Sequence, residues 1–181
     1  MVIELEGGRF QWRKPLFGEL KLNCDAAWRS DSKRKRIGWV LRDFAGIPKL
    51  AGGGVGGDRY GSVMMVEAEA VKEGMKVIIN YEIMEDGIRL MVESDANGLV
   101  QCLNKEAMAN VSLEVYLHDI WRMMRFFQLV KFCFTPRQCN RAAYSVAAYV
   151  VKHGERFGWD ELGPEFLFNV LAEDANVAIC I

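Results

Sequence analysis

The feature that most constrains the fold is the order of its apolar segments. Three short segments with the composition of strands come first: ELKLNCDAA, RIGWVLRD and IPKLAGG. The second and third are separated by DFAG, whose Asp and Gly suit a tight hairpin turn. Because strands joined by tight turns pair antiparallel, these segments predict a meander of three strands.

Beyond this meander, segments with helical spacing alternate with single strands. Periodicity predicts helices over about residues 62–81, in DANGLVQCLNK, in SLEVYLHDIWRMMRFF and in RQCNRAAYSVAAYVVKHG, the last ending at Gly154. GIRLMVES and QLVKFCFTP predict two more strands. A meander followed by this alternation predicts an α/β fold, with a mixed sheet and helices on its faces.

The length fits one domain with short extensions. We expect an N-terminal arm at residues 1–18, the domain at 19–154, and a C-terminal tail at 155–181. The tail contains one short apolar helix, in PEFLFNVLAED. The chain shows no internal repeat, and we expect a monomer.

A glycine block, AGGGVGGDRYG, contains a formal match to the dinucleotide-binding fingerprint at Gly52, Gly54 and Gly57. That fingerprint needs a helix opening at its last glycine and positive potential for a pyrophosphate. Here Asp58 follows the glycines, and the predicted helix begins several residues later. The block therefore favours a flexible loop leaving the third strand.

Composition excludes several classes of protein. No apolar run is long enough to cross a bilayer, and no secretory signal is visible at the start. The five cysteines form no close pair, which favours a reduced compartment, so we expect an intracellular protein of the nucleus or cytoplasm. The two histidines have no ligand spacing, which argues against structural zinc.

A basic run, RSDSKRKRIG, includes Lys33, Arg34, Lys35 and Arg36. Such a run is most often a solvated loop, and it also suits a phosphate contact or a nuclear localisation patch. The net charge of −1 argues against a protein that coats nucleic acid by bulk electrostatics.

Three acidic residues stand where predicted elements begin or end. Asp25 ends the first strand, Glu67 lies in the opening turns of the first helix, and Asp95 ends the fourth strand. Each has an ordinary explanation: a turn, a helix-dipole contact, or a helix cap that Asp95 or Ser94 provides. Alternatively, acids at the carboxyl ends of neighbouring strands lie where open α/β sheets place their sites. Spacing alone does not decide between these interpretations.

Several segments together resemble the ribonuclease H type 1 family, in the form that plants carry as free-standing or retroelement-derived domains. They are WRKPLFGELKLNCDAAW, IGWVLRDFAG, VEAEAVKEGMKVI, VESDANGLVQCLN, FTPRQCNRAAYSVA and the tail WDELGPEF. The resemblance implies a ribonuclease H-like fold: a five-stranded mixed sheet of order 3-2-1-4-5, with the first three strands antiparallel, flanked by helices.

The resemblance also implies a hydrolytic site with two magnesium ions, or manganese in their place. Asp25, Glu67 and Asp95 match the family's catalytic acids that hold these ions, and Glu69 is then only a neighbour. Magnesium prefers oxygen ligands, and two ions in one site suit an in-line displacement at phosphorus. The implied activity is endonucleolytic cleavage of the RNA strand of RNA/DNA hybrids.

The implied partner is a nucleic acid, either an RNA/DNA hybrid or a duplex shaped like double-stranded RNA, read by shape and 2′-hydroxyls. Its candidate contacts are Lys33, Arg34, Lys35, Arg36, Asn97, Arg137 and Asn140.

One position departs from the family pattern. Four residues after the asparagine of the last helix the family has an aspartate or histidine, whereas this chain has Tyr144 after Asn140. A phenol with a pKa near 10 is a poor magnesium ligand. We expect Tyr144 to point at the site, because positions i and i+4 share a helix face. The rival hypotheses are therefore a catalytically impaired nucleic-acid-binding module and a transposon-derived remnant without activity.

Overall fold

The computed structural model describes residues 4–5, 9–28, 35–55, 61–81, 87–154, 156–160 and 164–175. Its strands are β1 (Glu4–Leu5), β2 (Arg9–Phe10), β3 (Glu19–Trp28), β4 (Lys35–Arg42), β5 (Pro48–Val55), β6 (Arg89–Ser94), β7 (Leu129–Phe134) and β8 (Phe157–Trp159). Its helices are α1 (Val63–Asn80), α2 (Asn97–Leu103), α3 (Val111–Met123), α4 (Arg141–His153) and α5 (Phe168–Ala175), with short 3₁₀ turns η1 (Met124–Phe126), η2 (Arg137–Cys139) and η3 (Glu165–Leu167).

The meander and the strand order are confirmed. β3, β4 and β5 pair antiparallel in succession, while β6 and β7 run parallel to β3. The β4–β5 turn forms because the Asp43 Oδ1 accepts hydrogen bonds from the N–H groups of Ala45 and Ile47, at 2.9 and 3.0 Å. Five strands therefore have the expected order 3-2-1-4-5, and the helix that ends at Gly154 also lies where it was predicted.

The count of five strands is wrong, because the described sheet has six strands in the order β7-β6-β3-β4-β5-β8. β8 pairs antiparallel with β5 through Ala51↔Trp159, Gly52↔Gly158 and Gly53↔Phe157. Three residues are too short to show a period of two, and the middle one is glycine. The segment therefore carries no local strand signal, and only its pairing with β5 makes it a strand.

The glycine block is not a loop in its first half, since Gly52 to Gly54 are buried residues of β5. Close packing explains the composition. A Cβ on Gly53 would lie 2.8 Å from the Val150 side chain of α4, and one on Gly38 would lie 2.4 Å from the Ala147 nitrogen. Glycine lets α4 approach the sheet at this distance. The remainder of the block, with Gly57 and Asp58, lies outside the described residues.

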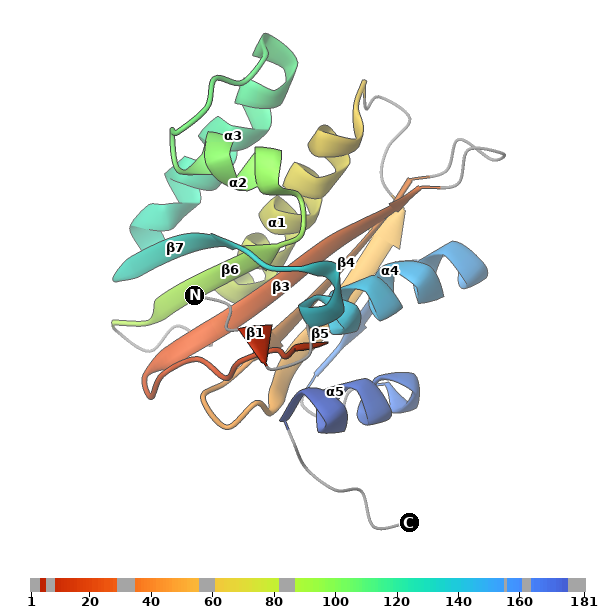
Figure 1. The fold of residues 1–181 in the computed structure, drawn as a ribbon. Helices are drawn as coiled ribbons and strands as arrows, with labels where there is room; N and C mark the ends of the chain where they lie inside the picture. The colour runs from red at the N-terminus through yellow and green to blue at the C-terminus, as the bar shows by residue number, and fades with distance from the viewer. Residues whose placement is uncertain are drawn as a thin grey trace.

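Helices cover both faces of the sheet (Figure 1). α1, α2 and α3 bury the larger core on one face, where Leu22 and Trp39 pack against helix residues such as Met75. α4 and α5 cover the other face, where Val40 packs with Val146 and Leu171 in a smaller cluster. None of the helices in the described part of the chain is both long and apolar enough to cross a membrane.

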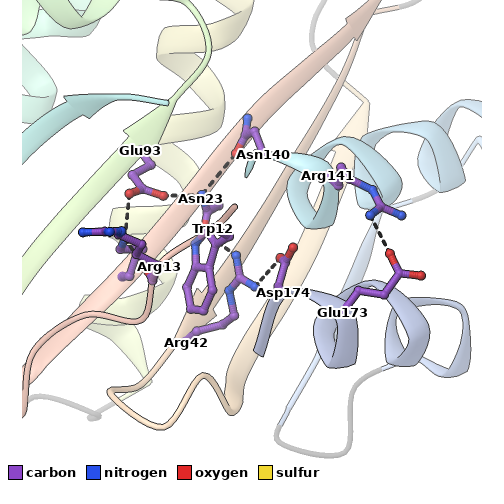
Figure 2. A network of polar contacts seen from close by, with 10 residues as sticks. Trp12, Arg13, Asn23, Arg42, Glu93, Asn140, Arg141, Glu173 and Asp174 are labelled. Atoms are coloured by element: carbon purple, nitrogen blue, oxygen red, sulfur yellow. Dashed lines mark hydrogen bonds and ion pairs between the residues drawn. The ribbon is translucent and has the colours of Figure 1, made fainter. Parts of the chain in front are cut away.

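A network of buried polar side chains lies on the face of the sheet that α4 and α5 cover, and it joins segments that are far apart in the chain (Figure 2). Asn23 is its centre. The Asn23 amide donates to Glu93 at 2.9 Å and to the side-chain oxygen of Asn140 at 3.2 Å. Its carbonyl oxygen accepts from Arg42 at 2.8 Å and from the Trp12 indole at 3.1 Å. The side chains of Trp12, Lys21, Asn23, Arg42, Glu93, Asn140 and Asp174 are called the Asn23 network below.

Charges in the Asn23 network are paired. Lys21 contacts Glu93 at 2.7 Å, and Arg42 contacts Asp174 of α5 at 2.7 Å. The Arg42 guanidinium also lies 3.4 Å from the centre of the Trp12 ring. Trp12, which precedes β3, and Asp174 of α5 therefore both contact Arg42 on the same face of the sheet.

Candidate metal centre

Strand register brings Asp25 and Asp95 together. β3 and β6 are parallel, and their last paired residues are Cys24 and Ser94. Asp25 and Asp95 are the next residues of these two segments, so they lie side by side where the β3–β6 ladder stops. This is the edge at which open α/β sheets place their sites. The prediction that Asp25 ends its strand is wrong, because β3 continues to Trp28 through its pairing with β4, in which Asp25 faces Gly38.

Glu67 reaches the same place from α1. The helix begins after Ser62, whose hydroxyl accepts a hydrogen bond from the Met65 N–H at 3.3 Å. Glu67 lies one turn further along and is only 6% exposed, because α1 packs closely on the sheet. One carboxylate oxygen from each of Asp25, Glu67 and Asp95 lies within 4.8 Å of the other two.

The electrostatics of this cluster disfavour three bare carboxylates. Burial, and then the negative charge of Asp95, raise the pKa of Asp25 to about 7. Burial, and then the charges of Asp25 and Asp95, raise the pKa of Glu67 to about 9. The nearby Arg137 cation lowers both pKa values only in part.

The cluster fits a divalent metal. The Asp25 Oδ2 and the Glu67 Oε2 are buried and have no hydrogen-bond partner among the described residues. Buried polar atoms of this kind are normally satisfied, so two such oxygens pointing into one cluster call for a ligand. A hard cation with oxygen ligands supplies the missing partner and offsets the repulsion between the acids.

The raised pKa values predict a pH dependence of stability without metal. The ordinary pKa values are 3.8 for Asp25 and 4.5 for Glu67, so the folded state holds more protons than the unfolded state above about pH 4. Stability must therefore fall as pH rises toward the folded pKa values. We expect the free energy of unfolding in EDTA to decrease by about 2–4 kcal/mol between pH 6 and pH 9, measured by urea denaturation.

The variant Asp25→Asn isolates this effect, since it removes one charge from the cluster and leaves other titrating groups in place. Its stability should decrease by about half as much over the same pH range as that of the wild type. Parallel curves for the two proteins would mean that the cluster does not cause the pH dependence.

The helix-cap interpretation of Asp95 is wrong. The residue before α2 is Ala96, and α2 has no side-chain cap hydrogen bond within the described residues. The Ser94 hydroxyl accepts from the Ala96 N–H at 3.1 Å and so shapes the turn between β6 and α2. The Asp95 carboxylate is left to point into the cluster.

Tyr144 stands beside the cluster and not within it. Its side chain is 41% exposed on α4. The Arg137 guanidinium lies 4.7 Å from the centre of its ring. The three carboxylates are the candidate metal-binding group that the described residues bring together, with no fourth acid.

Asn140 has a structural role, and its contact with nucleic acid stays a prediction. It is fully buried, and its amide donates to the Cys24 carbonyl at 2.8 Å while its side-chain oxygen accepts from Asn23. Asn140 therefore holds β3 next to Asp25. The role of Asn23 was missed in the sequence, although a polar residue between the apolar Leu22 and Cys24 in a buried strand was a signal.

The basic run is not a loop throughout. Lys35 and Arg36 belong to β4, where they are 7% and 2% exposed and pair with Trp28 and Ala27 of β3. Their contact with a duplex stays a prediction. Lys33 and Arg34 lie outside the described residues.

The remaining candidate contacts lie at the surface. Asn97 is exposed at the start of α2, two residues after Asp95, and Arg137 is exposed in η2. Both positions border the edge of the sheet at which the carboxylates meet.

Comparisons with known proteins place this geometry in context. A family model described as Reverse transcriptase-like matches residues 23–150. A search of curated proteins gave no match.

Solved structures of ribonucleases H are similar in fold. Ribonuclease H1 from Halobacterium salinarum is 17% identical, with a TM-score of 0.66, over 75% of this chain and 98% of that one. LC11-RNase H1, isolated from compost and solved with an RNA/DNA hybrid, is 14% identical, with a TM-score of 0.68 over 75% and 98%. The N-terminal RNase H domain of a Mycobacterium tuberculosis protein is 12% identical, with a TM-score of 0.65 over 75% and 94%. At these identities the likeness establishes a ribonuclease H-like fold.

Proposed function

The chain belongs to the Reverse transcriptase-like family, and from that premise we propose that it is a metal-dependent endonuclease that cleaves the RNA strand of RNA/DNA hybrids. One observation carries the proposal. Three acids from β3, α1 and the end of β6 converge within 4.8 Å, and two of their oxygens are buried without a partner among the described residues.

In this proposal Asp25, Glu67 and Asp95 hold two magnesium ions, with manganese as an alternative. When bound, such a pair of ions supplies an activated water and stabilises the leaving oxygen of an in-line displacement. The buried positions of Asp25 and Glu67 keep water from the carboxylates and hold their oxygens in place. Arg137 adds positive charge where a phosphate approaches the acids.

The substrate is proposed from the solved complex of LC11-RNase H1 with an RNA/DNA hybrid, together with the similarity in fold. A hybrid is recognised by its shape and by 2′-hydroxyls, without dependence on sequence. Among the candidate contacts, the exposed Asn97 and Arg137 border the carboxylates. Lys33 and Arg34 stay predictions.

A second function is favoured by Tyr144, which replaces the family's fourth acidic position. In that case the chain binds hybrids or similar duplexes, is slow or inactive as a nuclease, and derives from a transposon. We also propose that the protein is a type 1 domain of the plant kind, acting as a monomer in the nucleus or cytoplasm.

A cleavage assay tests the first function. Purified protein is incubated with a hybrid labelled on its RNA strand, with magnesium or manganese, beside the variant Asp95→Asn. We expect wild type to cut the RNA strand and the variant to bind the hybrid without cutting it. Binding without cleavage by both proteins would reject the nuclease and leave the binding module.

The variant Tyr144→Asp tests whether the missing fourth acid limits the cleavage rate. If the missing fourth acid limits catalysis, this change should raise the cleavage rate about 10-fold or more, since it adds an oxygen ligand beside the cluster. An unchanged or lower rate shows that Tyr144 is not what limits cleavage.

A further inference from the structure

A pocket opens beside the three carboxylates, between the end of β3 and α4. Its volume is about 650 Å³, which lies within the range of ligand sites. Ala26 and Ala27 line one side, and Ala27 lies two residues after Asp25 on the same face of β3. The pocket therefore lies next to the candidate metal centre.

The other side of the pocket is a stripe along α4. Tyr144, Ala148 and Lys152 are spaced by four residues, so they share one helix face. The exposed Arg137 of η2 also lines the pocket and holds its guanidinium over the Tyr144 ring. The described lining thus combines two cations with a flat aromatic ring and contains no acid.

This composition suits a nucleic-acid backbone. Cationic side chains contact phosphates and fix the position of a strand without reading its sequence. Tyr144 offers an apolar ring face at low conformational cost, because Arg137 already contacts it. Lys152 lies eight residues beyond Tyr144, about 12 Å along the helix, so a ligand that contacts both must be extended.

We propose that this pocket binds the sugar and phosphate of a nucleotide flanking the cleavage site, on the strand whose phosphate lies at the carboxylates. The assignment rests on the proposed function for the identity of that strand. Tyr144 packs against the sugar, and Lys152 contacts a phosphate further along. Tyr144 is then a substrate-positioning residue. It does more than replace the acid that the family has at this position, because its ring contacts the substrate.

Binding measurements test the pocket independently of cleavage. All variants are made in the Asp95→Asn background so that the RNA strand stays intact, and the affinity for a hybrid is measured over a range of salt concentrations. We expect Lys152→Gln to weaken binding about 3- to 10-fold and to reduce the slope of log K against log salt by about 1. Tyr144→Ala should weaken binding about 10-fold, while Tyr144→Phe, which keeps the ring, stays within about 2-fold.

Lys76→Gln is the matched control for charge. Lys76 is exposed on α1, nine residues from Glu67 and about 14 Å along the helix, and pairs with Glu73 at 3.7 Å. Its loss should leave the salt slope unchanged. Equal slopes for Lys152→Gln and Lys76→Gln would overturn the proposal.

A double-mutant cycle identifies which strand of the hybrid, and which phosphate on it, Lys152 contacts. Single neutral methylphosphonate linkages are placed along the RNA strand or along the DNA strand. At one linkage of the RNA strand, beyond the nucleotide that flanks the cleavage site, Lys152→Gln should have no further effect on binding. Coupling on the DNA strand only, or coupling nowhere, overturns the proposal, as does a wild type that binds no hybrid. If binding and coupling occur while the unmutated protein cleaves nothing, the pocket stands and the nuclease function falls.

Discussion

Replacing Glu67 by glutamine is expected to lower the rate of hybrid cleavage by on the order of 10³-fold. Metal-bound charge stabilises the transition state by several kcal/mol, and each 1.36 kcal/mol is a factor of ten in rate. Glu67 supplies a buried oxygen that has no other partner in the described residues. Its amide analogue keeps the size of the side chain but is a much weaker ligand for a hard cation.

Glu69→Gln is the matched control, two residues along the same helix. Its carboxylate pairs with Lys72 at 3.1 Å and is not part of the acidic cluster. Cleavage by this variant should stay within about 2-fold of wild type, since the pair is partly exposed and lies outside the acidic cluster. A comparable loss in both variants would show that general damage to α1, and not a lost ligand, explains the result.

The same Glu67→Gln variant should be more stable than wild type without metal at pH 8, since the raised pKa of Glu67 reflects the cost of a buried charge. Activity and stability then change in opposite directions. A carboxylate with a purely structural role would lose stability instead.

The second large effect concerns stability alone. Asp174→Ala is expected to lower the free energy of unfolding by about 3–5 kcal/mol, because it leaves the Arg42 guanidinium buried without its ion pair. Arg42 is fully buried, and its contact with Asp174 measures 2.7 Å. Urea denaturation followed by circular dichroism measures the change.

Glu173→Ala, the neighbouring substitution on α5, is the control. Glu173 pairs with Arg141 at 2.6 Å, but the two side chains are 59% and 48% exposed. Its removal should change stability by less than about 1 kcal/mol. If Asp174→Ala is equally mild, then water reaches Arg42 in solution and the Asn23 network does not depend on α5.

The candidate site was predictable in part. Asp95 comes directly after the apolar strand β6, whereas Asp25 lies within β3, and the parallel register of these two strands places the two acids side by side. The convergence of Glu67 with them required the packing of α1, which no spacing in the chain specifies. The resemblance to ribonucleases H named all three residues, and the structure supplies the 4.8 Å cluster.

The burial of three polar residues was not predictable from the sequence, because burial depends on partners that are distant in the chain. Lys35 and Arg36 look solvated in the sequence but are paired with β3. Asn140 looks like a surface amide but is held by Asn23 and Cys24.

Local patterns in the sequence determined the helices, the meander and the two parallel strands that follow it, because periodicity records which face of each element is buried. Tertiary structure alone decided that β8 joins the sheet, that Asp174 neutralises Arg42, and that Tyr144 borders a pocket beside the acids. Each of these depends on contacts between segments far apart in the chain. These contacts stabilise the protein only once the sheet has formed and α4 and α5 have packed on it.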